Sequence, residues 1–198
     1  MVSSLSSAQY DDLLNLILAF SKQSTPDQLL DTLLTKMMDM SHADAGTLYL
    51  LQGDQLHFCI VKNKTLGINQ SATETTSFPP IALDASNLDN VSAYTAVKKQ
   101  VVIVDDVYSD MRFNFTGPKN YDSMTGYKTK SMLMLPMTFY KEGESKLLGV
   151  IQLINATNKE NNEICSFSNV IDDFILVAIS NITTSVLFNY LLAQSKLK

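Results

Sequence analysis

The sequence contains little of what disulfide frameworks, zinc sites and thiol enzymes require. Only two cysteines occur in 198 residues, Cys59 and Cys165, and they lie far apart and outside any CxxC spacing. His42 and His57 are the only histidines, and neither lies beside a cysteine or a third ligand type at metal spacing. We therefore expect no metal site and no disulfide framework, in keeping with a protein of the reducing cytoplasm.

Positive charge is also scarce. The chain has 15 lysines and arginines against 20 acidic residues, which gives a formal net charge of -5 and an isoelectric point near 4.9. Such a surface repels phosphate backbones and anionic lipid head groups, and no run of Lys or Arg offsets this. The N-terminus lacks the basic start of a signal peptide, and polar residues interrupt the most apolar later segment. We expect neither a nucleic-acid nor a membrane partner.

Catalytic motifs are missing as well. The chain has no nucleophile elbow, no Gly-rich phosphate loop and no paired acid and base motif, so we expect a protein that is not an enzyme. Cys59 alternates with Phe58 in an expected strand and is predicted to lie in the core, whereas Cys165 lies in a polar segment. A redox enzyme would need one of these thiols to react rapidly at neutral pH.

What the chain does contain is the composition of an ordinary globular protein, with 45% hydrophobic and 18% charged residues. Apolar residues at helical spacing predict a first helix over residues 7–22. Thr25 and Gln28 flank Pro26 in a pattern typical of a helix start, which predicts a second helix from Pro26 to about Ser41.

From Gly46 onward the pattern changes to one typical of an antiparallel sheet. Two strands at 46–52 and 55–62 are separated by Gly53 and Asp54, a strong hairpin signal. We further predict a long polar loop at 63–80, a short helix at 92–99, a strand at 101–104, an irregular segment at 105–126, and two strands at 131–140 and 147–155. Three methionines on one of these strands, Met132, Met134 and Met137, are interpreted as core packing.

A long helix is predicted over residues 168–197, with apolar residues on more than one stripe. One stripe consists of Val170, Phe174, Val177, Asn181, Thr184, Phe188 and Leu191; the other consists of Leu176, Ile179, Thr183, Val186 and Tyr190. Two packing partners are implied. We expect one to be the sheet of the same chain and the other to be the same helix of a second chain.

The order of these segments, together with three motifs, resembles the GAF family, in the branch found in cyclic-nucleotide phosphodiesterases and in bacterial sensors fused to HD-type phosphohydrolases. The resemblance covers about residues 25–192. Its motifs are Asp106-x-Tyr108 followed by Phe113; Asp122-x-x-Thr125-Gly126-Tyr127-Lys128-Thr129-Lys130-Ser131 with Pro136; and Gly149-Val150-Ile151-Gln152-Leu153-Ile154-Asn155.

The resemblance implies an α+β fold: a central antiparallel sheet with the terminal helices packed on one face and the loops of a ligand pocket on the other. It divides the chain into an N-terminal helix at 1–24, a GAF-like core at 25–167 and a long helix for signalling or dimerisation at 168–198. Such domains bind cyclic nucleotides, other small molecules, haem or bilins, or bind nothing and hold dimers together.

The resemblance also implies candidate ligand-binding residues. They are Ser92 and Tyr94 at the start of the short helix, Asp106 after the strand, and Asp122, Thr125, Thr129 and Ser131 in the second motif. Their hydroxyls and carboxylates can bond a purine, and backbone N–H groups at a helix start can bond a phosphate. The alternatives are an ordinary helix cap and packed tyrosine for the first pair, and a turn stabilised by Asp122 for the second motif.

This chain departs from the relatives that hold cyclic nucleotides through an Asn-Lys pair after the last strand. The aligned pair is Asn155-Ala156, and the acidic residues expected soon after Phe167 come one position late. Asn158-Lys159 would replace the pair only in a different register. The ligand class therefore stays open between a cyclic nucleotide, another purine-like molecule and an amino-acid-like molecule.

Two functions remain in view. The first is a cytoplasmic sensor that passes its ligand state through the terminal helices to an output domain of a longer chain, and that forms a homodimer through the C-terminal helix. The alternative is a ligand-free dimerisation or scaffold domain whose pocket is filled by Phe113, Phe115 or Tyr121.

Overall fold

The computed structural model describes residues 11, 14, 15, 18, 25–70, 78–171 and 173–195. The predicted helix at 7–22 lies outside the described residues, apart from positions 11, 14, 15 and 18, whose backbone is helical. No helix in the described part of the chain is both long enough and apolar enough to cross a lipid bilayer.

One antiparallel sheet organises the molecule. Its strands run in the order β3-β2-β1-β7-β6-β5, with β4 paired to β2 and β8 paired to β7. The strands are β1 (Ala43–Gln52), β2 (Gln55–Asn63), β3 (Ile68–Gln70), β4 (Ile81–Ala82), β5 (Val102–Val104), β6 (Met132–Lys141), β7 (Glu144–Thr157) and β8 (Ile164–Cys165). The helices are α2 (Pro26–Met40), α3 (Val91–Lys98), α4 (Thr116–Thr125) and α5 (Asp173–Ser195), with short 3₁₀ turns at Ala85–Asn87 and Phe167–Asn169.

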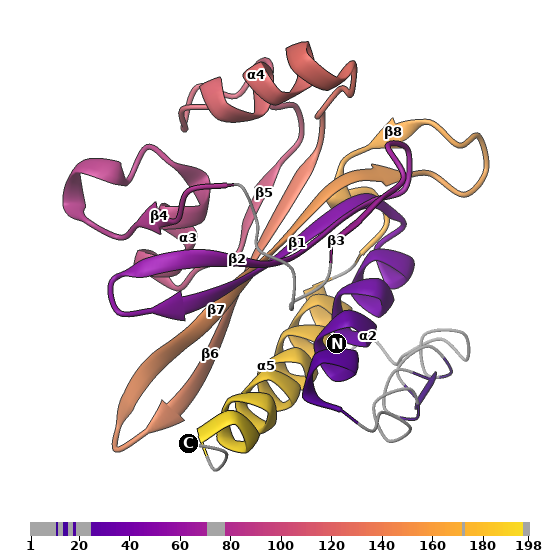
Figure 1. Cartoon of the computed structure of the whole chain (residues 1–198). Helices are drawn as coiled ribbons and strands as arrows, with labels where there is room; N and C mark the ends of the chain where they lie inside the picture. Colours follow the sequence, from indigo (N-terminus) through magenta and orange to yellow (C-terminus); the bar gives the residue numbers. More distant parts are fainter. Residues whose placement is uncertain are drawn as a thin grey trace.

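Helices α2 and α5 lie side by side on one face of the sheet, and α3 and α4 lie on the other (Figure 1). This arrangement confirms the predicted α+β fold. The start of α2 is also as predicted, because the Thr25 hydroxyl oxygen accepts a hydrogen bond from the Gln28 backbone N–H at 3.3 Å. Leu30, Leu33, Leu34 and Met37 follow at helical spacing and are fully buried.

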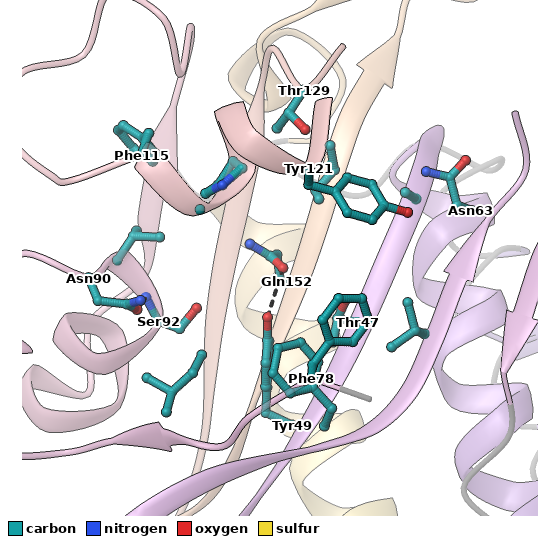
Figure 2. Close-up of a pocket in the computed structure, with 18 of the residues that line it drawn as sticks. Thr47, Tyr49, Asn63, Phe78, Asn90, Ser92, Phe115, Tyr121, Thr129 and Gln152 are labelled. Atoms are coloured by element: carbon teal, nitrogen blue, oxygen red, sulfur yellow. Dashed lines mark hydrogen bonds between the residues drawn. The ribbon is translucent and has the colours of Figure 1, made fainter. Parts of the chain in front are cut away.

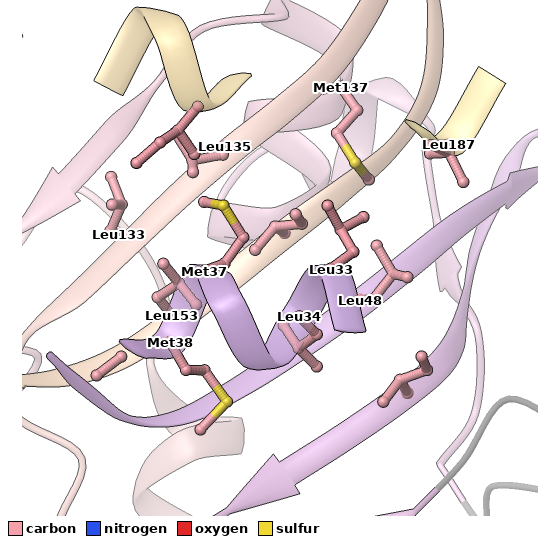
Figure 3. Packing of buried hydrophobic residues seen from close by; sticks show 14 of the residues in the cluster. Leu33, Leu34, Met37, Met38, Leu48, Leu133, Leu135, Met137, Leu153 and Leu187 are labelled. Carbon is pink, nitrogen blue, oxygen red and sulfur yellow. The ribbon is translucent and has the colours of Figure 1, made fainter. Parts of the chain in front are cut away.

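The main core lies between the sheet and the α2/α5 layer (Figure 3). Because side chains alternate along a strand, Leu133, Leu135 and Met137 of β6 join this core, whereas Met132 and Met134 face α3 and α4. All three methionines are fully buried, which confirms their interpretation as core residues.

Both predicted hairpins are present. Gly53 adopts a φ of 61° in the β1–β2 turn, and Glu142 and Gly143 adopt φ values of 55° and 81° in the β6–β7 turn. The two positive φ values of the β6–β7 turn are those of a type I′ turn, whose geometry matches the twist of the strands that it joins.

Two predicted loops contain regular structure. Residues 68–70, placed in a polar loop, form β3, which pairs along the edge of β2. The segment at 105–126, predicted to be irregular, contains α4. Gly117 and Pro118 occupy the first turn of α4, where backbone N–H groups have no partner within the helix.

The C-terminal helix begins later than predicted, at Asp173, because the Ser166 side chain caps a 3₁₀ turn in which Phe167 is fully buried. The second stripe of α5 faces the core, and its members Leu176, Ile179, Thr183, Val186 and Tyr190 are buried. The first stripe is divided: Phe188 packs on Phe139 with ring centroids 4.8 Å apart, whereas Val177 is 61% exposed.

Candidate ligand-binding site

A cavity of about 340 Å³ lies on the sheet face opposite α2 and α5, beneath α3 and α4. Its floor is formed by β1, β2 and β7, and its walls come from the starts of α3 and α4 and from residues 78–81 (Figure 2). This volume lies within the range of cavities that hold small molecules. Six aromatic rings line it: Tyr49, Phe58, Phe78, Phe115, Tyr121 and Tyr127.

Four of these rings form a continuous wall from the sheet to α4. The ring centroids lie 4.7 Å apart between Tyr49 and Phe58, 5.0 Å apart between Phe58 and Phe78, and 6.4 Å apart between Phe78 and Tyr121. Each pair is tilted, so the faces and edges of the rings meet at the distances typical of aromatic contacts. The wall offers a stacking surface to a flat ligand.

The floor carries a neutral polar cluster. The Tyr49 hydroxyl donates a hydrogen bond to Gln152 Oε1 at 3.0 Å (Figure 2). Gln152 Nε2 lies 3.3 Å from the Met132 sulfur. Burial raises the pKa of Tyr49 above its usual value, while hydrogen bonds from Ser92 and Thr47 act in the opposite direction. The phenol is therefore neutral at physiological pH, and every polar group of this cluster is uncharged.

Asparagine side chains accept hydrogen bonds from backbone N–H groups at both helices that begin at the cavity. Asn90 Oδ1 accepts from the backbone N–H groups of Ser92 and Ala93, at 2.9 and 3.1 Å, at the start of α3. Asn114 Oδ1 accepts from the Thr116 N–H at 3.0 Å at the start of α4. Both asparagines line the cavity. Three of the helix-start N–H groups that could bind an anion thus already have side-chain acceptors.

Among the described residues that line the cavity, Lys62 alone carries a positive charge. Its ammonium group lies 2.7 Å from Asp31 and 2.9 Å from the hydroxyl of Thr35, both on α2. Helix α2 covers the opposite face of the sheet, so this charge is directed away from the cavity.

Comparison with known proteins identifies the family of the chain. The family model described as "GAF domain" matches residues 25–179, more than half of the sequence. The chain belongs to the GAF family. In sequence it is similar to a cGMP-specific 3′,5′-cyclic phosphodiesterase of Drosophila melanogaster, 28% identical over 135 residues that cover 67% of this chain and 11% of that protein.

Another relative is the dual 3′,5′-cyclic-AMP and -GMP phosphodiesterase 11 of the same fly, 31% identical over 124 residues, 60% of this chain and 8% of that protein. The chain therefore spans about a tenth of the length of these two relatives. In fold it is similar to the GAF domain of an Acinetobacter phosphoenolpyruvate-protein phosphotransferase, with a TM-score of 0.66, 16% identity, and coverage of 96% of this chain and 99% of that one.

The same fold also occurs in the free methionine-R-sulfoxide reductase of Neisseria meningitidis, with a TM-score of 0.59 and 12% identity, covering 100% of this chain and 98% of that one. At such identity the likeness concerns the fold alone. In this GAF domain, burial and the charge of Asp27 raise the pKa of the Cys59 thiol to about 12. A neutral thiol is a poor nucleophile.

The candidate ligand-binding residues that the resemblance implies fall into two groups. Ser92 and Thr129 line the cavity. Tyr94 packs against Phe113 with ring centroids 5.1 Å apart, and Asp106 accepts from the Tyr108 N–H at 2.8 Å. Neither Tyr94 nor Asp106 belongs to the cavity lining.

The second motif holds the roof of the site in place. Asp122, 5% exposed, accepts from the N–H and hydroxyl of Thr129 and from the hydroxyl of Tyr108, each at 2.8 Å. Thr125 donates to the Tyr121 carbonyl at 2.8 Å, and the Ser131 hydroxyl accepts from the Ala156 N–H at 3.1 Å. These bonds fasten α4 and the start of β6, and Asp122, Thr125 and Ser131 lie outside the cavity lining.

Asn155 aligns with the asparagine that a lysine follows in the family pattern. In this GAF domain its side chain makes structural hydrogen bonds. With φ at 57°, it accepts from the Lys130 N–H at 2.7 Å and donates to the Lys128 carbonyl at 2.8 Å. It also donates to the Tyr127 hydroxyl at 3.0 Å, which itself donates to Asp44 at 2.8 Å. Asn158 accepts from the Glu160 N–H in the turn beyond β7, outside the cavity lining.

Sequence reasoning missed most of the lining. Tyr49 and Gln152 project from strands whose alternation was visible, and Gln152 is a polar residue in the middle of an apolar strand, yet only 8% exposed. A buried polar side chain at such a position is a readable signal. Asn90, which precedes a predicted helix, carried the signal of an N-cap.

Proposed function

We propose that this GAF domain is a non-catalytic regulatory module that binds a small planar molecule in the cavity and transmits binding through its helices to an output domain of a longer chain. The observation that carries the proposal is the cavity itself, with its aromatic wall and neutral polar floor. The output domain is supported by the two phosphodiesterase relatives, because the match covers only about a tenth of the length of each.

A path for transmission follows from the sheet. Tyr49 and Gln152 face the cavity, while their neighbours Leu48 and Ile151 pack in the core beneath α2 and α5. The register between β1 and β2 shifts at Leu48 and Tyr49, so the backbone is irregular at this point. A ligand that displaces Tyr49 also displaces Leu48, and it shifts the helices as far as its affinities for the two arrangements differ.

The alternative, a ligand-free dimerisation domain, requires aromatic side chains to fill the pocket. Phe115 and Tyr121 stand in the wall, and Phe113 packs against Tyr94 outside the lining, so an open volume of about 340 Å³ remains. A homodimer through α5 is compatible with the exposed Val177, and we propose it as an addition to sensing rather than as a substitute.

A thermal-shift screen tests the proposal. Purified protein is heated with cyclic mono- and dinucleotides, nucleosides, purines and amino acids, because a ligand that binds only the folded state raises the melting temperature. Ile154→Trp places a large ring in the cavity, whereas Val177→Trp adds the same ring on the exposed face of α5.

We expect at least one compound to stabilise the wild type and Val177→Trp but not Ile154→Trp. Absence of any stabilising compound, with a dimer that persists on dilution, would instead support the dimerisation domain.

A further inference from the structure

At the two helix starts beside the cavity, asparagine side chains of this chain already accept from three backbone N–H groups. A bound anion in a protein needs a cation or free backbone N–H groups, since burying an unpaired charge is costly. At α3, Asn90 accepts from two N–H groups, and at α4, Asn114 accepts from one. Pro118, in the first turn of α4, has no N–H to offer.

Three carboxylates bond to residues that line the cavity. Asp122 bonds to Thr129, a lining residue, and Asp44 bonds to the hydroxyl of Tyr127, another lining residue. Asp89 accepts from the side-chain amide of Asn114 at 3.4 Å. The ammonium group of Lys62 is bound on the opposite face of the sheet.

These carboxylates also affect the groups that line the cavity. After burial, the charge of Asp122 is the next cause that raises the pKa of Tyr121, and Asp44 acts in the same way on Tyr127. A carboxylate that disfavours a nearby phenolate also disfavours an anionic ligand at the same place.

We propose that the cavity selects an uncharged heteroaromatic molecule, of the size of a nucleobase or nucleoside, and discriminates against ligands that carry phosphate or another anionic group. The flat ring stacks on the wall formed by Phe58, Phe78 and Tyr121, and its polar edge bonds to the Gln152 amide and the Ser92 hydroxyl. This inference rests on the proposed function and names its ligand class.

Two pairs of probes, each differing in one anionic group, test the selection. Guanosine is compared with cyclic GMP, and the neutral dye phenylnaphthylamine is compared with anilinonaphthalene sulfonate. Dissociation constants are measured by calorimetry for the first pair and by fluorescence for the second. Ile154→Trp shows whether each probe occupies the cavity, because a probe in the cavity loses affinity in this variant.

The variant Asn90→Gly tests whether the capped N–H groups of α3 cause the discrimination against anions. It removes the acceptor that occupies the two N–H groups of α3, and glycine is well tolerated at a helix cap. Thr25→Gly makes the same kind of change at the start of α2, whose cap residue lies outside the cavity lining, and serves as the matched control.

We expect the neutral member of at least one pair to bind in the cavity at least about tenfold more tightly than its anionic counterpart. In Asn90→Gly the preference should shrink by about fivefold through tighter anion binding, because free N–H groups at a helix start attract anions. Thr25→Gly should leave the preference unchanged.

Equal or tighter binding of the anionic members overturns the inference while supporting the proposed function. A preference that is the same in Asn90→Gly as in the wild type overturns the role of the capped start of α3. Failure of all four probes to bind in the cavity contradicts the ligand class, and the proposed function then falls only if the wider thermal-shift screen also finds no ligand.

Discussion

Removing the Asp122 carboxylate should cost the domain a large part of its stability. Asp122 is the one buried residue of α4, and its two oxygens accept three hydrogen bonds, two from Thr129 and one from Tyr108. In Asp122→Ala the Tyr108 hydroxyl turns to water, since this side chain is 46% exposed. Thr129 is 2% exposed, so its N–H and its hydroxyl are left without acceptors.

The cost follows from those two donors. A buried donor without a partner costs about 1–3 kcal/mol, so two of them place the loss in unfolding free energy at about 4 kcal/mol. The control is Tyr108→Phe, which removes only the bond to the exposed hydroxyl and should change stability by less than about 0.5 kcal/mol.

Urea denaturation followed by circular dichroism measures both variants against the wild type. A loss below about 1 kcal/mol in Asp122→Ala, or equal losses in the two variants, would refute the conclusion that this carboxylate fastens α4 to the start of β6. It would return Asp122 to the candidate ligand-binding residues, as the family motif implies.

Three further predictions concern the backbone, the thiol and alkaline pH. Gly149→Ala should lower the free energy of unfolding by more than about 3 kcal/mol, because its Cβ would lie 2.1 Å from a backbone carbonyl oxygen. Gly46→Ala meets only movable side-chain atoms at 3.0 Å or more and should cost about 1 kcal/mol, so equal losses in urea denaturation would contradict this reasoning. The Cys59 thiol, with its pKa raised to about 12, should resist maleimide at pH 8 in the native state and react once unfolded, as mass spectrometry will show; rapid native labelling would be the opposite result. Burial and Asp44 raise the pKa of Tyr127, so the folded state keeps a proton that the unfolded state loses above about pH 10, and stability falls there. Tyr127→Phe should make the fall in unfolding free energy between about pH 9 and 11 shallower, and an unchanged slope in a series of denaturation experiments would disprove this role of Tyr127.

Local signals in the sequence were sufficient for most of the fold. The hairpin at Gly53 and the capped start of α2 depend on a few neighbouring residues, and the structure contains both. Helix α4 was missed because Gly117 and Pro118 disfavour a helix interior, whereas their cost in a first turn is small. Strand β3 was missed because three polar-flanked residues on a sheet edge carry no periodic pattern.

The site was harder to predict for a different reason. Alternation along β1 and β7 places Tyr49 and Gln152 on one face of the sheet, but only the packing of α2 and α5 decides which face is left for a ligand. The family motif indicated residues close to the cavity, but the side chains of two of them, Asp122 and Ser131, make hydrogen bonds within the protein. Position in a motif does not distinguish a side chain that faces a cavity from one that supports it.

One sheet serves two separate purposes in this domain. The face beneath α2 and α5 holds the larger core, and the other face holds the cavity, so successive residues of β1 and β7 belong alternately to each. Substitutions at the cavity positions leave the side chains of this larger core in place, since the two sets share a backbone but no side chains. Such a scaffold can exchange one ligand for another over evolutionary time and keep its shape.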